Sequence, residues 1–369
     1  MTAEPLSLLA LNRATLDRQL LLRRAAMTAG QAIGHLTGLQ AQAPLAPYVG
    51  LWTRLAGFRH EELKDLITER AVVRAHLHRN TVHLLTAEDY LTFRPLFSPL
   101  LERALASHFR RNLAGVDLAE LRDVATTLLA ETPLTRAELG RRLAGRWPGH
   151  DPGSLAYAAT HLLPLVQVPP RGLWGSTGQS TWFLAAAWLE GTTAQPLTER
   201  QAAGELVLRY LAAYGPASVN DIQAWSGLSR LREVTEGLSR RLRAFTGPDG
   251  GELLDVPDAP RPGEYVHAPP RFLPEYDNLL LSFADRSRVI PDGRPVPLPP
   301  GNGASMGTLL VDGFWWANWT ITRGRDRAVL EVQPVKPLRG SHDDIAREAS
   351  RLLEFAAPAA AHDVRFAES

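Results

Sequence analysis

Residues 205–245 read ELVLRYLAAYGPASVNDIQAWSGLSRLREVTEGLSRRLRAF and carry the strongest structural signal in the chain. Gly215-Pro216 ends one helical pattern, Ser218 is placed to cap the next, and Gly227-Leu228-Ser229 forms a turn between two short helices. A glycine in such a turn is typical of a helix-turn-helix. The elements predicted here are helices over 205–214, 219–226 and 231–245.

The last of these helices is rich in arginine. Arg240, Arg241 and Arg243 follow Glu233 and Glu236 along it. A helix with this composition can face DNA phosphates, and it can equally be a solvated amphipathic helix. The pattern leaves both interpretations open.

Two earlier segments show the same order of elements, helix, helix, helix and hairpin, without repeating the sequence. The helix that starts at the cap Thr28 is predicted to run toward Gln40 and Gln42 before Pro44 ends it, so both glutamines are expected at or near a helix C-terminus. A small hairpin is predicted around Arg79-Asn80. The other predicted elements are helices over 9–22, 48–55, 60–70, 87–110, 118–129, 138–144 (capped by Thr135) and 150–167, hairpin strands within 72–85, and paired short strands over 173–183.

The last part of the chain is predicted to be rich in strands. Residues 247–270 hold several prolines and indicate a linker or an irregular wing, and residues 291–307 indicate either a projecting hairpin or a surface loop. The predicted elements are strands over 278–283, 309–311, 314–322 and 328–332, and a closing helix over 342–355. We therefore predict an α+β fold, mainly α, with winged-helix-like units at 1–115, 116–196 and 197–268 and a β-rich part at 269–369.

The composition is that of an ordinary globular protein. With 369 residues, 45% of them hydrophobic and 21% charged, the chain is expected to form roughly two to four packed units. The absence of cysteine excludes disulfides, iron–sulfur clusters and a thiolate nucleophile. Glu4 precedes the first apolar stretch, and no uncharged run approaches the ~20 residues of a membrane span, so we expect no export and a cytoplasmic location. The net charge of +1 is weak support for nucleic-acid binding.

Several enzyme classes lack their motifs in this sequence. There is no P-loop, no GxSxG elbow and no HExxH. Lys64 and Lys336 are the only candidates for a Schiff base. His76, His78 and His83 lie close together, but no carboxylate is spaced to complete a metal shell, so we predict no metal site.

A short charged segment, ADRSR at 284–288, allows two interpretations. Asp285 and Arg286 are predicted to form a structural ion pair. Alternatively, Arg286 or Arg288 contacts a DNA phosphate.

Three segments together indicate a family: 39–55 (LQAQAPLAPYVGLWTRL), 77–90 (LHRNTVHLLTAEDY) and 273–290 (LPEYDNLLLSFADRSRVI). They resemble AlkZ-like DNA glycosylases, bacterial proteins of three tandem winged-helix units. The resemblance extends over essentially the whole chain. It implies that the three units form a C-shaped channel for DNA.

The predicted role of Gln40 and Gln42 depends on this resemblance. On spacing alone, Gln40 and Gln42 are two polar residues at a helix end. In the family, a glutamine, a hydrophobic residue and a second glutamine form the catalytic motif, and Gln40, Ala41 and Gln42 match it in order. A sister branch of the family has aspartate at the third position.

The resemblance implies a monofunctional DNA glycosylase that hydrolyses the N-glycosidic bond of N7- or N3-alkylated purines. Such bases are already cationic and leave readily, so Gln40 and Gln42 need only position a water and stabilise charge on the sugar. The family is tied to self-resistance against DNA-alkylating and crosslinking natural products. Base excision repair of bulky adducts and unhooking of interstrand crosslinks are therefore expected.

The resemblance also implies how DNA is held. Arg79, Thr81 and His83 fall in the segment next to the glutamines and are expected to touch the lesion strand, although packing explains His83 equally well. Residues 291–307 resemble the family's DNA-probing hairpin. The implied partner is double-stranded DNA with alkylated purines, bound by a monomer in the bacterial nucleoid without metal or organic cofactor.

A non-catalytic winged-helix DNA-binding protein or transcription regulator is the alternative. Such a regulator usually has a dimerisation element that reads paired half-sites. The sequence shows no heptad seam or spare amphipathic helix for one.

Overall fold

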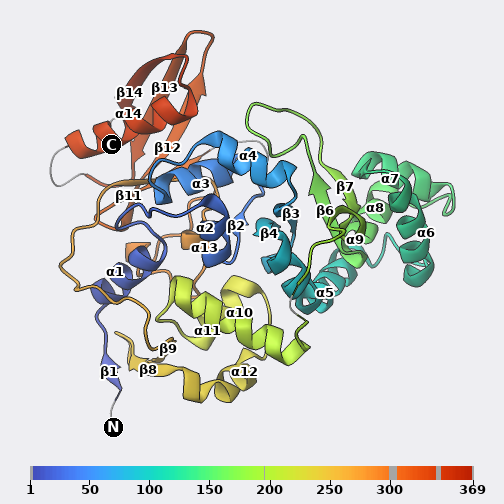
Figure 1. The fold of residues 1–369 in the computed structure, drawn as a ribbon, viewed down its shortest axis with the longest axis horizontal. Coiled ribbons are helices and arrows are strands. Elements are labelled where there is room, and N and C mark those ends of the chain that lie inside the picture. Colours follow the sequence, from blue (N-terminus) through green and yellow to red (C-terminus); the bar gives the residue numbers. More distant parts are fainter. Residues whose placement is uncertain (1–2, 195, 299–305, 338–341, 368–369) are drawn as a thin grey trace.

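The computed structural model describes residues 3–194, 196–298, 306–337 and 342–367, and it combines helices with three β-sheets (Figure 1). The α-helices are α1 (Leu8–Arg18), α2 (Ala29–His35), α3 (Ala46–Arg54), α4 (His60–Thr68), α5 (Ala87–Phe109), α6 (Leu118–Glu131), α7 (Arg136–Ala144), α8 (Pro152–Leu162), α9 (Ala185–Trp188), α10 (Glu199–Tyr214), α11 (Val219–Ser226), α12 (Leu231–Gly237), α13 (Asn278–Leu281) and α14 (Asp343–Ala356). Short 3-10 turns lie at His78–Asn80, Ser239–Arg241 and Pro291–Gly293. The fold is therefore a mixture of helix and strand, as expected.

One sheet joins strands from the first half of the chain. Its members in spatial order are β2 (Leu39–Gln40), β4 (Val82–Thr86), β3 (Val72–His76), β6 (Leu165–Val168), β7 (Thr181–Leu184) and β5 (Leu134–Thr135). Strands β3 and β4 form the hairpin predicted within 72–85, and that prediction is confirmed. The register between β3 and β6 consists of one pair, Arg74 opposite Gln167. This pair joins the two halves of the sheet.

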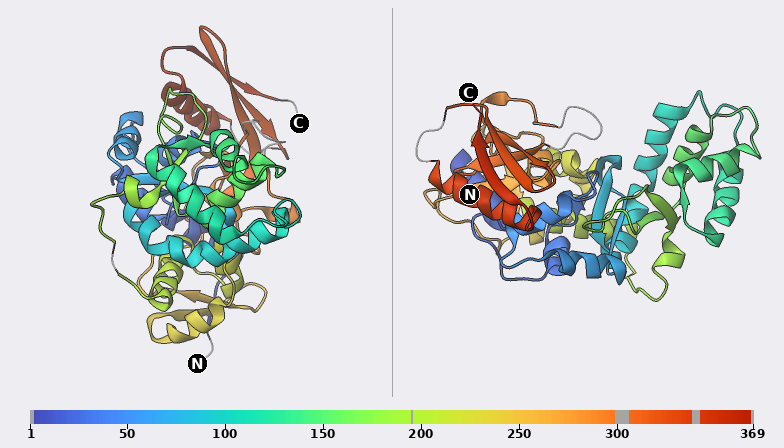
Figure 2. Two further views of the ribbon diagram at one scale, coloured as in Figure 1. Left: turned by 90° about the vertical axis from the view of Figure 1, so that its right-hand side faces the viewer. Right: turned by 90° about the horizontal axis from the view of Figure 1, so that it is seen from above.

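The other two sheets connect distant parts of the chain. A small sheet has the order β1 (Glu4–Pro5), β8 (Arg243–Thr246) and β9 (Glu252–Asp255). The C-terminal sheet has the order β10 (Arg271–Leu273), β11 (Gly307–Val311), β12 (Phe314–Arg323), β13 (Arg327–Pro334) and β14 (Ala361–Phe366). Figure 2 shows this sheet and α14 at one end of the molecule, with α6, α7 and α8 at the other.

The predicted helix caps are confirmed. Thr28, Thr135 and Ser218 each accept a hydrogen bond from a backbone N–H in the first turn and take part in a capping box. Gly227 ends α11 with φ 81°, a conformation that glycine adopts without strain. Helices α10, α11 and α12 are followed by the β8–β9 hairpin. The three helices predicted within residues 205–245 are thus present, and a hairpin follows them where the sequence indicated a linker or an irregular wing.

The glutamines do not lie at a helix end, and that prediction was wrong. Helix α2 stops at His35, and Thr37 and Gly38 follow with φ of 55° and 93°. A Cβ at Gly38 would come within 2.6 Å of the side chain of Leu85, so both the turn and the close packing require glycine there. After this turn the chain enters β2, which carries Gln40.

Other predicted elements also differ from the structure. In place of the paired strands expected over 173–183, the structure has one strand, β7, which pairs with β6 and β5. Within the strand predicted over 278–283, Asn278–Leu281 form the short helix α13 instead, because a buried apolar run of this length fits either a helix or a strand. The helices predicted over 150–167 and 231–245 end earlier, at Leu162 and Gly237. In both cases the chain turns and continues as a strand, β6 or β8, so a helical period followed by a short strand was mistaken for one long helix.

The segments predicted to be irregular are partly ordered. Residues 247–270 contain β9, and β10 and β14 extend the C-terminal sheet beyond the strands expected. The hairpin expected over 291–307 includes residues 299–305, which lie outside the described residues.

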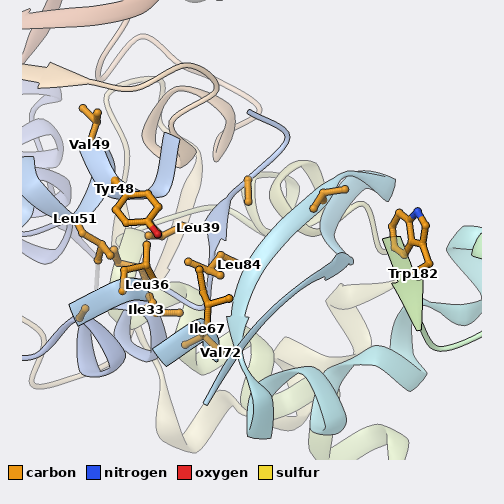
Figure 3. Close-up of a cluster of buried hydrophobic side chains, with 14 of the residues drawn as sticks. Ile33, Leu36, Leu39, Tyr48, Val49, Leu51, Ile67, Val72, Leu84 and Trp182 are labelled. Atoms are coloured by element: carbon orange, nitrogen blue, oxygen red, sulfur yellow. The ribbon is translucent and has the colours of Figure 1, made fainter. Parts of the chain in front are cut away.

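A buried apolar cluster supports one side of β2. Leu39 and Leu84 are register partners on β2 and β4, and they lie beside Ile33, Leu36 and Tyr48 (Figure 3). Alternate residues of a strand point to opposite faces of the sheet. Packing of Leu39 against the core therefore directs the next residue, Gln40, to the other face.

Candidate active site

Gln40 lies opposite His83 in the pairing of β2 with β4. Side chains of directly opposed residues share one face of a sheet. Gln40 is 7% exposed and Gln42, just beyond the strand, is exposed. The structure therefore brings together two of the predicted catalytic and DNA-contacting residues, Gln40 and His83.

The backbone orients both glutamine side chains. The backbone N–H of Gln42 donates to Oε1 of Gln40 at 2.7 Å, and the backbone N–H of Val82 donates to Oε1 of Gln42 at 3.2 Å. These donors decide which end of each amide is oxygen. Neither Nε2 has a protein acceptor among the described residues. The carbonyls thus fix the orientation of both side chains, and each oxygen keeps a second lone pair.

A brace behind the motif was not foreseen. Oδ1 of Asn278 accepts from the backbone N–H of Gln40 at 2.9 Å, and its Nδ2 donates to the carbonyl of Gly38 at 2.8 Å and to the hydroxyl of Tyr214 at 3.1 Å. The preceding Asp277 accepts two hydrogen bonds of 2.8 Å from Arg54. Asn278 lies in the family-like segment 273–290, which was the available signal. Strand β2 is thus held by β4 along one edge and by this hydrogen-bond network along the other.

Arg74 is a second residue that sequence reasoning missed. It lies on β3 at 3% exposure, and its Nη2 donates to the carbonyl of Ala41, between the two glutamines, at 2.8 Å. Its Nε and Nη1 are buried without a hydrogen-bond partner. Burial, and then repulsion from Arg171, lower the pKa of Arg74 to about 10. In the sequence, Arg74 could have been noticed as a charged residue within the short strand VVRAH, all of whose residues are buried.

Arg79 and Arg286 lie near each other on another side of the motif. Arg79 adopts φ 51° in the β3–β4 turn and donates to the carbonyl of Trp225. Burial lowers the pKa of Arg79 to about 10, and repulsion from Arg286 contributes to that shift. Nε of Arg286 is buried without a partner. A contact of either arginine with DNA stays a prediction.

Thr81 and His83 make local hydrogen bonds. Thr81 donates from Oγ1 to the carbonyl of His78 at 3.1 Å, and Nδ1 of His83 donates to the carbonyl of Thr81 at 3.0 Å. Burial lowers the pKa of His83 to about 3, so its imidazole is neutral at physiological pH. Their contact with the lesion strand stays a prediction.

The segment ADRSR differs from what its sequence led us to expect. Asp285 accepts hydrogen bonds from the backbone and hydroxyl of Ser287, and the ion pairs of the described residues do not include one between Asp285 and Arg286. Arg288 is 5% exposed, donates to the carbonyl of Pro216 at 2.8 Å and lies over the ring of Phe283. In this conformation Arg288 is a buried structural residue, which argues against its predicted phosphate contact.

A cavity of about 370 Å³ opens beside Gln42. The residues that line it include Gln42, Arg74, His76, Gln167, Arg171 and Trp182. A larger cavity of about 700 Å³ lies next to α11 and the segment 284–288, and Gln40 and Gln42 do not line it. Of these two cavities, the smaller one adjoins the motif, because Gln42 lines it.

Two further observations concern the described residues only. Their His, Asp and Glu side chains form no group of three that could hold a metal ion. None of the helices they form is long and apolar enough to cross a membrane.

Comparison with known proteins identifies a family, a similar curated protein and a similar solved structure. A family model described as DNA glycosylase AlkZ-like matches residues 33–355. An interstrand DNA cross-link repair glycosylase from Streptomyces sahachiroi is 24% identical over 250 residues, which cover 65% of this chain and 64% of the relative. The match thus spans less than two thirds of that relative. The solved structure of the Streptomyces sahachiroi DNA glycosylase AlkZ is similar with a TM-score of 0.77 over 100% of both chains at 21% identity, so the two share a fold.

Proposed function

This chain belongs to the AlkZ-like DNA glycosylase family, and from that membership we propose that it hydrolyses the N-glycosidic bond of N7- or N3-alkylated purines in duplex DNA. The observation that carries the proposal is the pair of glutamines, Gln40 and Gln42. Their carbonyl oxygens are held by backbone N–H groups while both amide Nε2 groups lack a protein partner among the described residues. Such fixed polar groups are suited to positioning a water and a charged sugar.

The chemistry follows from the substrate. An alkylated purine leaves C1′ with the bonding electron pair, which neutralises its positive charge, and water adds to C1′ and loses a proton. The free lone pair of a glutamine Oε1 accepts a hydrogen bond from that water, and the charge that develops on the sugar is stabilised by the amide dipoles. The neutral His83, with a pKa of about 3, is a weak base. The mechanism therefore relies on a good leaving group rather than on proton abstraction.

The name of the curated relative extends the proposal to crosslinks. That protein is called an interstrand DNA cross-link repair glycosylase. We propose that this chain also releases bulky adducts and unhooks crosslinks, because a cationic alkylpurine in a crosslink offers the same leaving group. Self-resistance to alkylating natural products in a bacterial cytoplasm is the setting that fits this activity.

The arrangement on DNA is part of the same proposal. We infer three tandem winged-helix units, in which the hairpins β3–β4 and β8–β9 serve as wings, wrapped around the duplex as a monomer in a C-shaped channel. Lys64 is exposed on α4, outside the strands β2 and β4 that hold Gln40 and His83. This supports a monofunctional enzyme that leaves an abasic site, since strand cleavage by a Schiff base requires a lysine at the lesion.

The test is single-turnover excision of N7-methylguanine from a labelled duplex, with abasic sites revealed by hot alkali. Gln40→Ala and Gln42→Ala are each expected to lower the rate by roughly a hundredfold, the usual loss when one preorganised polar group is removed. Gln333→Ala is the control, because Gln333 is exposed on β13 and lies in another sheet. DNA binding of all variants is measured in parallel by fluorescence anisotropy.

Full activity in both glutamine variants would overturn the catalytic assignment. Absence of excision by the wild type on N7-methylguanine and on a crosslinked duplex, combined with sequence-specific binding that ignores both substitutions, would favour the transcription regulator instead.

A further inference from the structure

We propose that the cavity lined by Arg74, Gln167 and Trp182 beside Gln42 binds one backbone phosphate of the DNA. This inference rests on the proposed function, because it takes DNA as the ligand. It assigns a positioning role to a cavity that the glutamine chemistry does not use.

The cavity is built from buried polar groups that lack partners. Arg74 is 3% exposed and Trp182 is 1% exposed, yet Nε and Nη1 of Arg74 and Nε1 of Trp182 have no hydrogen-bond partner. Nδ1 of His76 and Oε1 of Gln167 are likewise buried and unpartnered. A turn of the Gln167 amide would present its Nε2 as a donor in place of the oxygen. Buried donors are normally satisfied, so this concentration indicates a missing acceptor.

The charge of the cavity selects an anion. Among the described residues, no Asp or Glu lines it, whereas Arg136 and Arg171 line it together with Arg74. The Arg136 guanidinium lies 5.4 Å from the ring centroid of Trp182. A buried guanidinium without a counter-ion is costly, and a phosphate would supply charge-assisted hydrogen bonds to it. The positively charged alkylpurine would be repelled by the same arginines. A phosphate therefore fits this cavity and the damaged base does not.

The position of Arg74 links such a phosphate to the motif. Arg74 and Gln167 are the register pair that joins β3 to β6, and the remaining Nη2 of Arg74 donates to the carbonyl of Ala41 at 2.8 Å. A phosphate bound to Arg74 would thus be separated by one side chain from the backbone between Gln40 and Gln42. Binding there would fix the deoxyribose of the lesion relative to both glutamines.

The experiment replaces single phosphates by neutral methylphosphonates at each position within a few nucleotides of the lesion, in either strand. The duplex carries the 2′-fluoro analogue of N7-methyldeoxyguanosine, whose glycosidic bond resists cleavage, so Kd is measured without excision. At one position the replacement is expected to raise the Kd of the wild type by at least about tenfold, as for other close charge pairs. In Arg74→Gln the same replacement should change Kd by less than about twofold, because its partner is already missing.

Two further variants distinguish loss of the phosphate site from misfolding and from a general loss of positive charge. Arg171→Gln, at the half-buried rim, should also reduce the effect of that one methylphosphonate. Arg141→Gln is the matched control, since Arg141 is exposed on the same helix as Arg136 but does not line the cavity; it should keep the full tenfold response. Circular dichroism confirms that each variant is folded.

Absence of any position whose effect depends on Arg74 or Arg171 would overturn the proposal, and equal responses in Arg141→Gln and Arg74→Gln would do the same. Because Kd does not require turnover, a protein that binds in this position-specific way but excises nothing would refute the glycosylase activity and leave the phosphate site supported.

Discussion

Two buried arginines flank the glutamine segment, and their surroundings are opposite. Arg54, at the end of α3, is fully buried and makes two hydrogen bonds of 2.8 Å to Asp277, whose side chain is 2% exposed. Arg74, on β3, is 3% exposed and has no carboxylate partner; one nitrogen donates to the carbonyl of Ala41. Both residues support the motif, Arg54 through Asp277 and its neighbour Asn278, and Arg74 directly.

The difference separates a structural charge from one that is available for a ligand. A buried ion pair with complete hydrogen bonding offsets the cost of desolvating both groups, whereas an unpaired buried guanidinium retains that cost. A fold keeps such a cost when a ligand relieves it. The pairing of buried charges therefore distinguishes Arg54, which holds the protein together, from Arg74, for which we propose a phosphate ligand.

Removing Arg54 is expected to have the largest effect on stability. Arg54→Met leaves Asp277 buried without its counter-charge, which should lower the free energy of unfolding by about 3–5 kcal/mol. Denaturant unfolding followed by circular dichroism measures this loss. A variant as stable as the wild type would show that the ion pair does not anchor α13 to α3.

The second largest effect on stability is expected from low pH, through a histidine that packs against the cavity lined by Arg74. His161 packs against His76 with ring centroids 5.1 Å apart, and burial lowers the pKa of His161 from 6.5 to about 4. Between these pH values the unfolded state binds more protons, so the free energy of unfolding falls as the pH falls, by roughly 3 kcal/mol over the window. His161→Asn, which can keep the bond to Tyr157, should show a shallower decline. Parallel curves for the two proteins would exclude this linkage.

Replacing Asn278 is expected to lower the free energy of unfolding by an intermediate amount and to slow excision. Asn278→Ala removes buried hydrogen bonds to Gln40 and Gly38, which should cost about 1–3 kcal/mol. Excision should slow as well, because β2 loses its brace. Measuring the rate at a temperature where the variant is fully folded separates the two effects; an unchanged rate there would limit Asn278 to a structural role.

Removing Arg74 should change stability least. Arg74→Met breaks the bond to Ala41 but also removes an unpaired buried charge, and these opposed terms should leave the free energy of unfolding within about 1 kcal/mol of the wild type. DNA binding should nevertheless weaken. A stability loss as large as that of Arg54→Met would erase the contrast between the two arginines.

Local signals predicted the fold well where they were complete. The capping residues Thr28 and Ser218 and the turn at Gly227 each act within a few residues, so the sequence shows their physical cause directly. The boundary errors arose where tertiary packing decides. Gly38 turns the chain because Leu85 lies against it, and nothing near Gly38 in the sequence reveals that contact.

The residues of the site also fall into those that the sequence predicted and those that only the structure reveals. Gln40 and Gln42 were predicted through the family resemblance, and their catalytic role stays a prediction. The brace from Asn278 joins residues 238 positions apart, and the register partner of Arg74, Gln167 on β6, also lies far along the chain, so neither contact could follow from spacing. The lack of a counter-ion for Arg74 is visible only once every neighbour is placed.

The long-range contacts of the N-terminal region have a consequence for synthesis on the ribosome. Arg18 forms an ion pair with Asp255, 237 residues later, and the backbone N–H of Gln40 donates to Asn278, which is also synthesised much later. At about 5–20 residues per second, that wait lasts roughly ten to fifty seconds, during which the nascent N-terminal segment cannot complete its native contacts. The strand that carries Gln40 is thus synthesised early and completes its native contacts late. A fragment that stops before α13 would carry both glutamines without the residue that braces them.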